Sequence, residues 1–271
     1  MIMTVSLLFD PRCWGVLAGL YVAVSSILFQ FPHLLHRRRP YRPVFDVRTI
    51  AHRGGREHTP ENTIAAFRNG ARHSDMLELD VWLTTDGDVV VFHDDDLHRM
   101  TNGDDLRRTD ELSSKEWSDL LLRPKPSDGW DQGHAKDDGK QQYAVPFLKD
   151  IFAALPRETR FIIEFKQDSQ ALVEKVYAMA AEDGRLDHIV WFSLKQPINQ
   201  RLCDFSRSVP RIVSVQAVLR ITLLFFCGLL PFVDVPEDIF GLKVRRSSGR
   251  ALIRDPFIFS SLLLHFHRSA R

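Results

Sequence analysis

Short apolar runs that stop at ionisable residues recur through the middle of the chain. Each run has the length and the bounding residues of a β-strand. The predicted strands are a first one that ends at His52 and others at residues 76–83, 89–93, 161–166, 188–193 and 211–215. Segments with helical spacing lie between most of them, at residues 63–71, 145–155, 169–182 and 196–206. This order predicts an α/β fold, a barrel with its polar groups at one rim.

Charged residues within two of these runs fall on one face of their strand. Side chains two positions apart in a strand point the same way. Glu78 and Asp80 therefore share a face, and so do Glu164 and Lys166. Two adjacent carboxylates repel each other, which suggests a cation or a proton between Glu78 and Asp80.

A long apolar segment precedes the predicted barrel. Residues 14–31 carry no charge and have about the minimum length for crossing a bilayer. Arg12 comes before this segment, and a basic cluster around residues 37–39 follows it. A cleaved signal peptide has the reverse order of charge, so we expect a retained transmembrane helix with the basic side in the cytoplasm. A buried core helix is the alternative.

A second strongly apolar segment covers residues 219–235. Arg220 and Pro231 limit it, and the part between them is short for a membrane span. We expect a membrane-surface element or a hydrophobic lid. A core helix under the barrel is an equally good interpretation.

These features divide the chain into three predicted parts. Residues 1–39 form the membrane anchor and its basic flank, residues 40–241 the barrel domain, and residues 242–271 a divergent basic tail. Inside the barrel domain, the polar residues 124–143 predict a solvated surface loop. Thr59 is predicted to cap the first helix of the barrel, with Pro60 at its first position.

Composition narrows the classes of protein that the chain can belong to. Of the 271 residues, 44% are apolar and 26% are charged, which is ordinary for a folded protein. A net charge of +1 gives no reason to expect a nucleic-acid partner. The three scattered cysteines form neither a disulfide framework nor a zinc pattern.

Four motifs, in the order HRGGREHTPENT, ELDVWLT, VVFHDDDL and IIEFK, resemble those of the glycerophosphodiester phosphodiesterase family. The resemblance covers roughly residues 46–216, and the anchor and the LLPF stretch look like its small membrane-anchored lysophospholipase D branch. It implies a TIM barrel that hydrolyses glycerophosphodiesters or lysophospholipids and releases the head-group alcohol. Family members continue for two more βα units that nothing after Gly241 matches, so we expect a barrel that is incomplete at its C-terminal end.

The resemblance also assigns the three acids to a metal site. Glu78, Asp80 and Glu164 match the family's metal ligands, and carboxylates suit a hard divalent cation such as Mg²⁺ or Ca²⁺. The cation would polarise the phosphoryl oxygen of the substrate.

The remaining candidate site residues are two histidines and two cations. His52 and His93 match the family's acid/base pair, and imidazoles exchange protons near neutral pH. The sequence does not say which histidine gives a proton and which takes one. Arg53 and Lys166 are expected to bind the phosphate, although pairing of Arg53 with a neighbouring acid is an alternative.

Other polar residues near these motifs have several interpretations. Glu61 could reach the metal, hold His52 or favour the start of a helix. Asn62 is expected to brace its loop. The acidic residues Asp94 to Asp96 are interpreted as a solvated rim.

We therefore expect a membrane-tethered, metal-dependent phosphodiesterase of lipid metabolism, at the endoplasmic reticulum or another endomembrane, with its catalytic domain in the cytoplasm. A lysophospholipid or glycerophosphodiester would be its substrate. One alternative is a catalytically impaired membrane protein with a regulatory role or none. A second is an unrelated barrel hydrolase that uses the acids to bind a metal.

Overall fold

The computed structural model describes residues 11–31, 34–35, 47–55, 59–123 and 143–239. Most of the predicted surface loop at 124–143 and all of the predicted tail at 242–271 lie outside the described residues. The chain divides into two compact units. The larger contains residues 44–216 and 237–254, and the smaller contains residues 1–43, 217–236 and 255–271.

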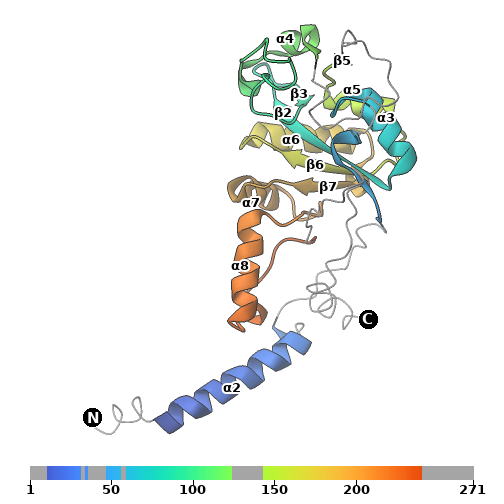
Figure 1. Cartoon of the computed structure of the whole chain (residues 1–271). Coiled ribbons are helices and arrows are strands. Elements are labelled where there is room, and N and C mark those ends of the chain that lie inside the picture. The colour runs from blue at the N-terminus through green and yellow to red at the C-terminus, as the bar shows by residue number, and fades with distance from the viewer. Residues whose placement is uncertain (1–10, 32–33, 36–46, 56–58, 124–142, 240–271) are drawn as a thin grey trace. The chain divides into compact units, whose positions relative to one another are not determined.

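A parallel sheet forms the centre of the larger unit (Figure 1). Its strands are, in spatial order, β1 (Ile50–Ala51), β2 (Met76–Leu83), β6 (Phe161–Phe165) and β7 (Ile189–Phe192). Each neighbouring pair is parallel, as a barrel of this type requires.

Beyond β7, the described part of the chain continues the sheet only as single bridges, from Trp191 to Arg211 and from Ile212 to Ile239. The strand that the sequence predicted at residues 211–215 is therefore reduced to bridging residues. Pro210 lacks an N–H and helix α8 (Val215–Phe226) begins soon afterwards, which leaves little room for a ladder.

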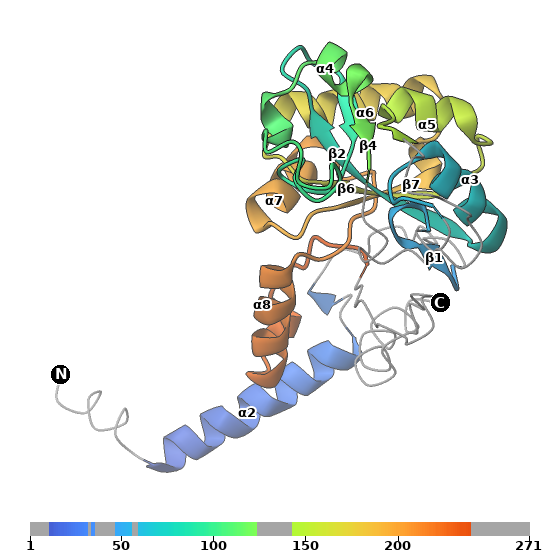
Figure 2. The same ribbon diagram turned by 45° about the horizontal axis from the view of Figure 1, so that its top comes forward.

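Helices that follow the strands in sequence pack on one face of this sheet, and Figures 1 and 2 show them beside the strands. They are α3 (Ile64–His73), α5 (Leu148–Ala154), α6 (Gln170–Glu182) and α7 (Gln196–Phe205). Their buried side chains form one apolar cluster with alternate residues of the strands, such as Leu77, Leu79 and Ile163. The shorter helical turns are η2 (His52–Gly54), η3 (Thr109–Glu111) and η5 (Leu186–His188).

The other face of the sheet changes from apolar to charged along the strands. Met76 and Ile162 belong to a small buried cluster with Val190 and Ile212. Two positions farther along, β2 carries Glu78 and β6 carries Glu164 on that same face. On this face, buried apolar side chains thus come two positions earlier along each strand than these carboxylates.

Strand β3 (Val89–Val91) pairs with β2 in the antiparallel direction, so it is a hairpin partner and not a parallel barrel strand. The turn between them is closed by the Thr84 N–H, which donates to the Asp88 carbonyl at 2.9 Å. Helix α4 (Ser114–Asp119) and the pair β4 (Leu121–Leu122) and β5 (Tyr143–Ala144) follow. Ser113 and Glu116 form the capping box of α4.

The start of α3 differs from the sequence prediction. Thr63, not Thr59, is the N-cap, and its hydroxyl accepts from the Ala66 N–H at 3.2 Å. The preceding residue, Asn62, has a left-handed φ of 55°, so the chain enters the helix later than the proline suggested.

The smaller unit contains α2 (Pro11–Gln30), the main part of α8, and the turn η6 (Leu230–Phe232). Tyr21 stacks on Phe232, and Ser25 donates to the Gly228 carbonyl at 2.5 Å. A transmembrane helix was expected at residues 14–31. Among the described residues no helix is both long and apolar enough to cross a membrane, so this expectation is not supported.

A buried arginine ties together the segments behind β6. The Arg185 side chain is fully buried, and its guanidinium donates to the carbonyls of Phe152, Leu155 and Pro156 at 2.8, 2.8 and 2.7 Å. The carbonyls of Phe152 and Leu155 belong to the C-terminal end of α5, where backbone carbonyls have no partner within the helix.

We predict that Arg185→Ala lowers the free energy of unfolding by about 3 kcal/mol, because several buried carbonyls lose their donor at once. Urea denaturation measures this loss. Arg201→Ala is the control, since Arg201 makes an exposed ion pair with Asp168, and we expect its unfolding curve to follow that of the wild type. Equal losses of unfolding free energy in the two variants would contradict the stabilising role of the Arg185 hydrogen bonds.

Candidate active site

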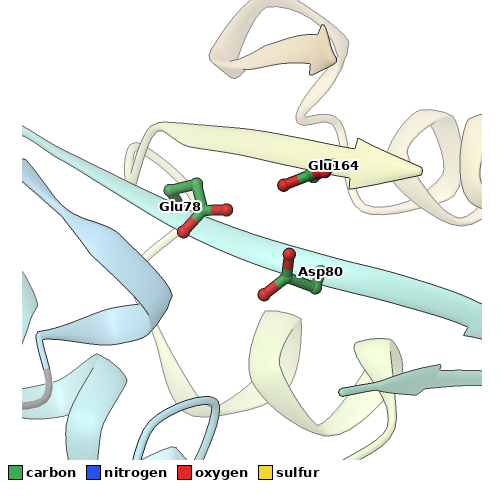
Figure 3. A group of neighbouring side chains, drawn as sticks. All are labelled: Glu78, Asp80 and Glu164. Atoms are coloured by element: carbon green, nitrogen blue, oxygen red, sulfur yellow. The ribbon is translucent and has the colours of Figure 1, made fainter. Parts of the chain in front are cut away.

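Three carboxylates from two neighbouring strands meet on the polar face of the sheet (Figure 3). Glu78 and Asp80 come from β2 and Glu164 from β6, and Asp80 and Glu164 are register partners. One oxygen of each lies within 4.8 Å of those of the other two. All three residues are buried, with Asp80 at 0% exposure. The strand alternation thus gathers these acids as the sequence analysis expected.

Burial and mutual repulsion disfavour ionisation of two of these acids. Burial, followed by the charges of Asp80 and Glu164, raises the pKa of Glu78 well above its ordinary value. Burial and the Asp80 charge likewise raise the pKa of Glu164. The cluster therefore has more negative charge than its protein surroundings stabilise.

Lys166 supplies positive charge beside these acids. Its Nζ lies 2.9 Å from Asp80 Oδ1 and 2.8 Å from Glu164 Oε1. Burial opposes the charged form of Lys166, but the two carboxylates outweigh it and raise its pKa. Burial likewise opposes ionisation of Asp80, and the Lys166 charge together with His93 and Asn62 leaves its pKa below the ordinary value.

The loop after β1 brings His52 and Arg53 to the carboxylates. The Arg53 N–H donates to Glu78 Oε2 at 2.7 Å, and His52 Nε2 lies 3.9 Å from the same oxygen. Arg53 has a left-handed φ of 54°, which is uncommon for a residue with a side chain. Gly70 of α3 must be a glycine here, because an added Cβ would lie 2.4 Å from the Gly54 carbonyl oxygen.

Asn62 holds Asp80 from the other end of the same loop. Its Nδ2 donates to Asp80 Oδ2 at 2.9 Å, and its own N–H donates to the Arg53 carbonyl at 2.9 Å. Asn62 therefore braces the loop, as expected, and also contacts a candidate metal ligand.

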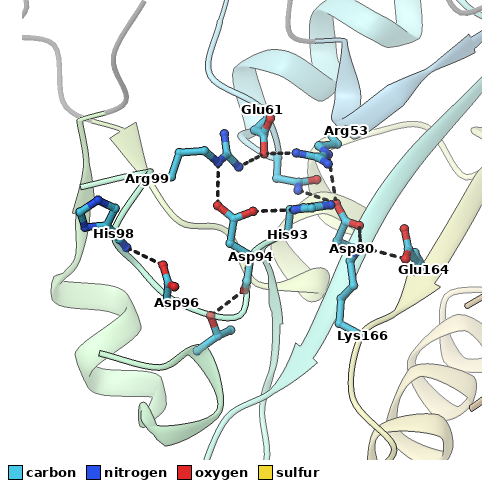
Figure 4. A network of polar contacts seen from close by, with 12 residues as sticks. Arg53, Glu61, Asp80, His93, Asp94, Asp96, His98, Arg99, Glu164 and Lys166 are labelled. Carbon is cyan, nitrogen blue, oxygen red and sulfur yellow. Dashed lines mark hydrogen bonds and ion pairs between the residues drawn. The ribbon is translucent and has the colours of Figure 1, made fainter. Parts of the chain in front are cut away.

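A chain of ion pairs joins this loop to His93, which follows β3 (Figure 4). Glu61 Oε1 accepts from Arg53 Nη1 at 2.7 Å and from Arg99 Nη2 at 2.5 Å. Arg99 Nε donates to Asp94 Oδ2 at 2.7 Å, and Asp94 Oδ1 contacts His93 Nδ1 at 2.6 Å. Because a carboxylate only accepts, His93 Nδ1 carries the proton.

These contacts change three of the sequence interpretations. Asp94 is not part of a solvated rim, since both of its carboxylate oxygens are engaged. Burial opposes its ionisation, but hydrogen bonds from His93 and Arg99 hold its pKa well below the ordinary range. Glu61 bridges two arginines, a role that none of the earlier options included, and Arg53 does pair with a neighbouring acid.

The structure thus brings together His52, His93, Arg53, Lys166, Glu78, Asp80 and Glu164. Arg99 was missed, because no local spacing distinguishes it from the other arginines of its loop. The all-oxygen ligand set and the excess of negative charge fit a hard divalent cation.

The sequence matches the Glycerophosphoryl diester phosphodiesterase family over residues 52–207. The chain belongs to this family. The matched segment includes all of the site residues named above, and members of the family are phosphoric diester hydrolases.

Curated relatives point to one branch of the glycerophosphoryl diester phosphodiesterase family. The mouse protein named lysophospholipase D GDPD1 is 37% identical over 227 residues, which are 83% of this chain and 69% of the relative. Mouse lysophospholipase D GDPD3 is 33% identical over 224 residues, which are 82% of this chain and 65% of the relative.

Solved structures of the family have the same fold. A glycerophosphodiester phosphodiesterase from Agrobacterium tumefaciens aligns with a TM-score of 0.50 at 27% identity, over 62% of this chain and 65% of its own. The corresponding domain of a Mycobacterium tuberculosis protein has a TM-score of 0.57 at 18% identity, over 77% of this chain and 78% of its own. These alignments support the barrel-type α/β fold.

We predict that Glu78→Gln stabilises the chain at neutral pH in the presence of a chelator. Folding raises the pKa of Glu78, so folding free energy is lost as the pH rises from the ordinary glutamate range through the raised pKa. Glutamine removes the charge but can still accept from the Arg53 N–H. Thermal unfolding at pH 7.5 should show a gain of about 1 kcal/mol, or about 2–4 °C, that disappears below about pH 4.5.

The control for this measurement is Glu174→Gln on the exposed face of α6. Its melting temperature should follow that of the wild type at both pH values. A Glu78→Gln variant that is less stable than the wild type at pH 7.5 would show that repulsion does not dominate the cluster.

Proposed function

We propose that this chain is a divalent-cation-dependent phosphodiesterase that hydrolyses the head-group ester of lysophospholipids or glycerophosphodiesters. The products are the head-group alcohol and either lysophosphatidic acid or glycerol phosphate. The observation that carries the proposal is the buried cluster of three carboxylates, flanked by two histidine-bearing segments, in a chain of this family. Relatives named lysophospholipase D favour the lipid substrate.

Glu78, Asp80 and Glu164 would hold the cation, Mg²⁺ or Ca²⁺. Their oxygens are the ligand type that these cations prefer, and one added dication offsets the repulsion that raises two of the pKa values. When bound, the cation polarises the phosphoryl oxygen and neutralises charge on the phosphate.

The two histidines account for the proton transfers. Hydrolysis breaks the bond between phosphorus and the head-group oxygen and forms a bond to the attacking oxygen. One proton must therefore leave the nucleophile and one must reach the leaving alcohol. His93 uses Nδ1 for Asp94, which leaves Nε2 for the substrate. His52 adjoins Glu78 on the opposite segment. The nucleophile is water, or a glycerol hydroxyl that displaces the head-group alcohol and gives a cyclic phosphate, which water then opens.

Arg53 and Lys166 provide positive charge for the phosphate. The Nε of Arg53 is buried and has no hydrogen-bond partner within the described part of the chain, although it lies 3.9 Å from Asp80 Oδ2. Such a donor suits a phosphate oxygen. The ammonium of Lys166 is held at the carboxylates and stabilises added negative charge beside them.

A lipid substrate also agrees with the character of α8. Leu219, Leu223 and Phe226 on this helix are 66%, 64% and 75% exposed. Exposed apolar residues on an amphipathic helix favour contact with a membrane surface. The proposed location is the surface of the endoplasmic reticulum or another endomembrane, with the catalytic domain in the cytoplasm.

We predict that the purified chain releases choline from lysophosphatidylcholine when Mg²⁺ or Ca²⁺ is present and not in excess chelator. Glu78→Ala and His52→Ala should each lower kcat by about 10²–10⁴-fold, because one removes a cation ligand and the other an acid/base group. Choline release and lysophosphatidic acid formation are measured together, with glycerophosphocholine as a parallel substrate.

Glu174→Ala is the matched control and should keep the wild-type rate. Absence of turnover by the wild type with either cation would refute the proposed function. If the chain hydrolysed glycerophosphocholine but not lysophosphatidylcholine, the phosphodiesterase activity would stand and the preference for a lipid substrate would be wrong.

A further inference from the structure

Arg99 belongs to a loop and not to a helix or strand, yet its side chain contacts two segments of the site (Figure 4). Its Nε donates to Asp94 Oδ2 at 2.7 Å and its Nη2 to Glu61 Oε1 at 2.5 Å. Two donors of one planar guanidinium thus fix the distance between the two carboxylates.

On one side, Arg99 reaches His93 through Asp94. The Asp94 carboxylate contacts both residues, because its Oδ2 accepts from Arg99 and its Oδ1 lies 2.6 Å from His93 Nδ1. The Asp94 carbonyl accepts from the Thr109 hydroxyl at 2.7 Å, which fixes the backbone as well. A carboxylate held in this way orients an imidazole and selects its tautomer.

On the other side, Arg99 reaches the segment of His52 through Glu61. Glu61 Oε1 also accepts from Arg53 Nη1 at 2.7 Å, and Arg53 directly follows His52. Arg53 has the left-handed φ of 54°, a conformation that persists only when the surroundings hold it. The Glu61 bridge is one of the contacts that do so.

The loop of Arg99 contains a matched arginine, Arg107, whose side-chain ion pairs within the described residues do not include the segment of His52 or of His93. Arg107 pairs with Asp105 at 2.7 Å and with Glu116 at 3.1 Å, so it too binds two carboxylates. Its side chain is 47% exposed, compared with 29% for Arg99. Exposed ion pairs contribute little to stability, so a stability measurement alone would not separate the role of Arg99 from that of Arg107.

We propose that Arg99 is a positioning residue that acts through Asp94 and Glu61 to hold the His93 imidazole and the His52 loop in one arrangement. The proposal deepens the phosphodiesterase function proposed above and rests on it. Arg99 touches no substrate in this scheme and exchanges no proton.

The test compares Arg99→Gln with Arg107→Gln in steady-state turnover of lysophosphatidylcholine. We expect Arg99→Gln to lower kcat by about 10–100-fold, with KM changed by about threefold or less and a melting temperature close to that of Arg107→Gln. Arg107→Gln should keep the wild-type kcat. In the double variant Arg99→Gln with Asp94→Asn, kcat should fall by a smaller factor than the product of the two single reductions, because both substitutions act on His93.

A second readout does not depend on turnover. Isotope-labelled histidine, with His93 assigned through a His93→Gln variant, reports by NMR which ring nitrogen carries the proton. The wild type should show a proton on Nδ1 of His93, and Arg99→Gln should show a mixture of the two tautomers. A wild type without turnover would count against the proposed function, and the NMR comparison would still decide the positioning role.

An unchanged kcat in Arg99→Gln, or an unchanged His93 tautomer, would overturn the proposal. If Arg99→Gln does not fold, Arg99→Lys takes its place. An ammonium cannot match the fork that spans two carboxylates, so we expect Arg99→Lys to have a kcat between that of the wild type and that of His52→Ala. A full wild-type kcat in Arg99→Lys would also overturn the proposal.

Discussion

Repulsion among three buried carboxylates is the constraint on which this site depends. Glu78, Asp80 and Glu164 stand on one face of two adjacent strands, where water screens their charges poorly. Lys166 offsets part of the charge through Asp80 and Glu164, and the pKa values of Glu78 and Glu164 remain raised. A fold that tolerates such a cluster retains an attraction for cations, and this attraction is the physical basis of the proposed metal site.

Backbone strain in the neighbouring loop is coupled to the same carboxylates. Arg53 and Asn62 both have left-handed φ values, and each such residue costs about 1 kcal/mol or more. Each conformation places a donor on an acid, since the Arg53 N–H meets Glu78 and the Asn62 side chain meets Asp80. Hydrogen bonds to buried carboxylates are strong enough to offset the strain. The two acids therefore stabilise the loop, and the loop in turn holds the acids in place.

Strand periodicity made much of this architecture predictable, whereas contacts between loops were not. β2 begins and ends where its alternating pattern indicated, and the shared face of Glu78 and Asp80 follows from the same period. The family motifs indicated His52 and His93 as candidate acid/base residues. The N-cap at Thr63 was missed because the left-handed turn at Asn62 depends on its contact with Asp80, which lies far along the chain. Arg99 was missed for the same reason, since both of its partners are fixed by tertiary structure.

The packing that stabilises the sheet is also what holds the site in register. Leu77 and Leu79 pack against the helices, and Glu78 and Asp80 point to the opposite face. A slip of β2 by one residue would bury two carboxylates under the helices and would place two leucines at the site. The penalty for burying unpaired charges is several kcal/mol, so the apolar core strongly disfavours that register. The helix-facing leucines therefore exclude every register that differs by an odd number of residues from the one in which Asp80 meets Glu164.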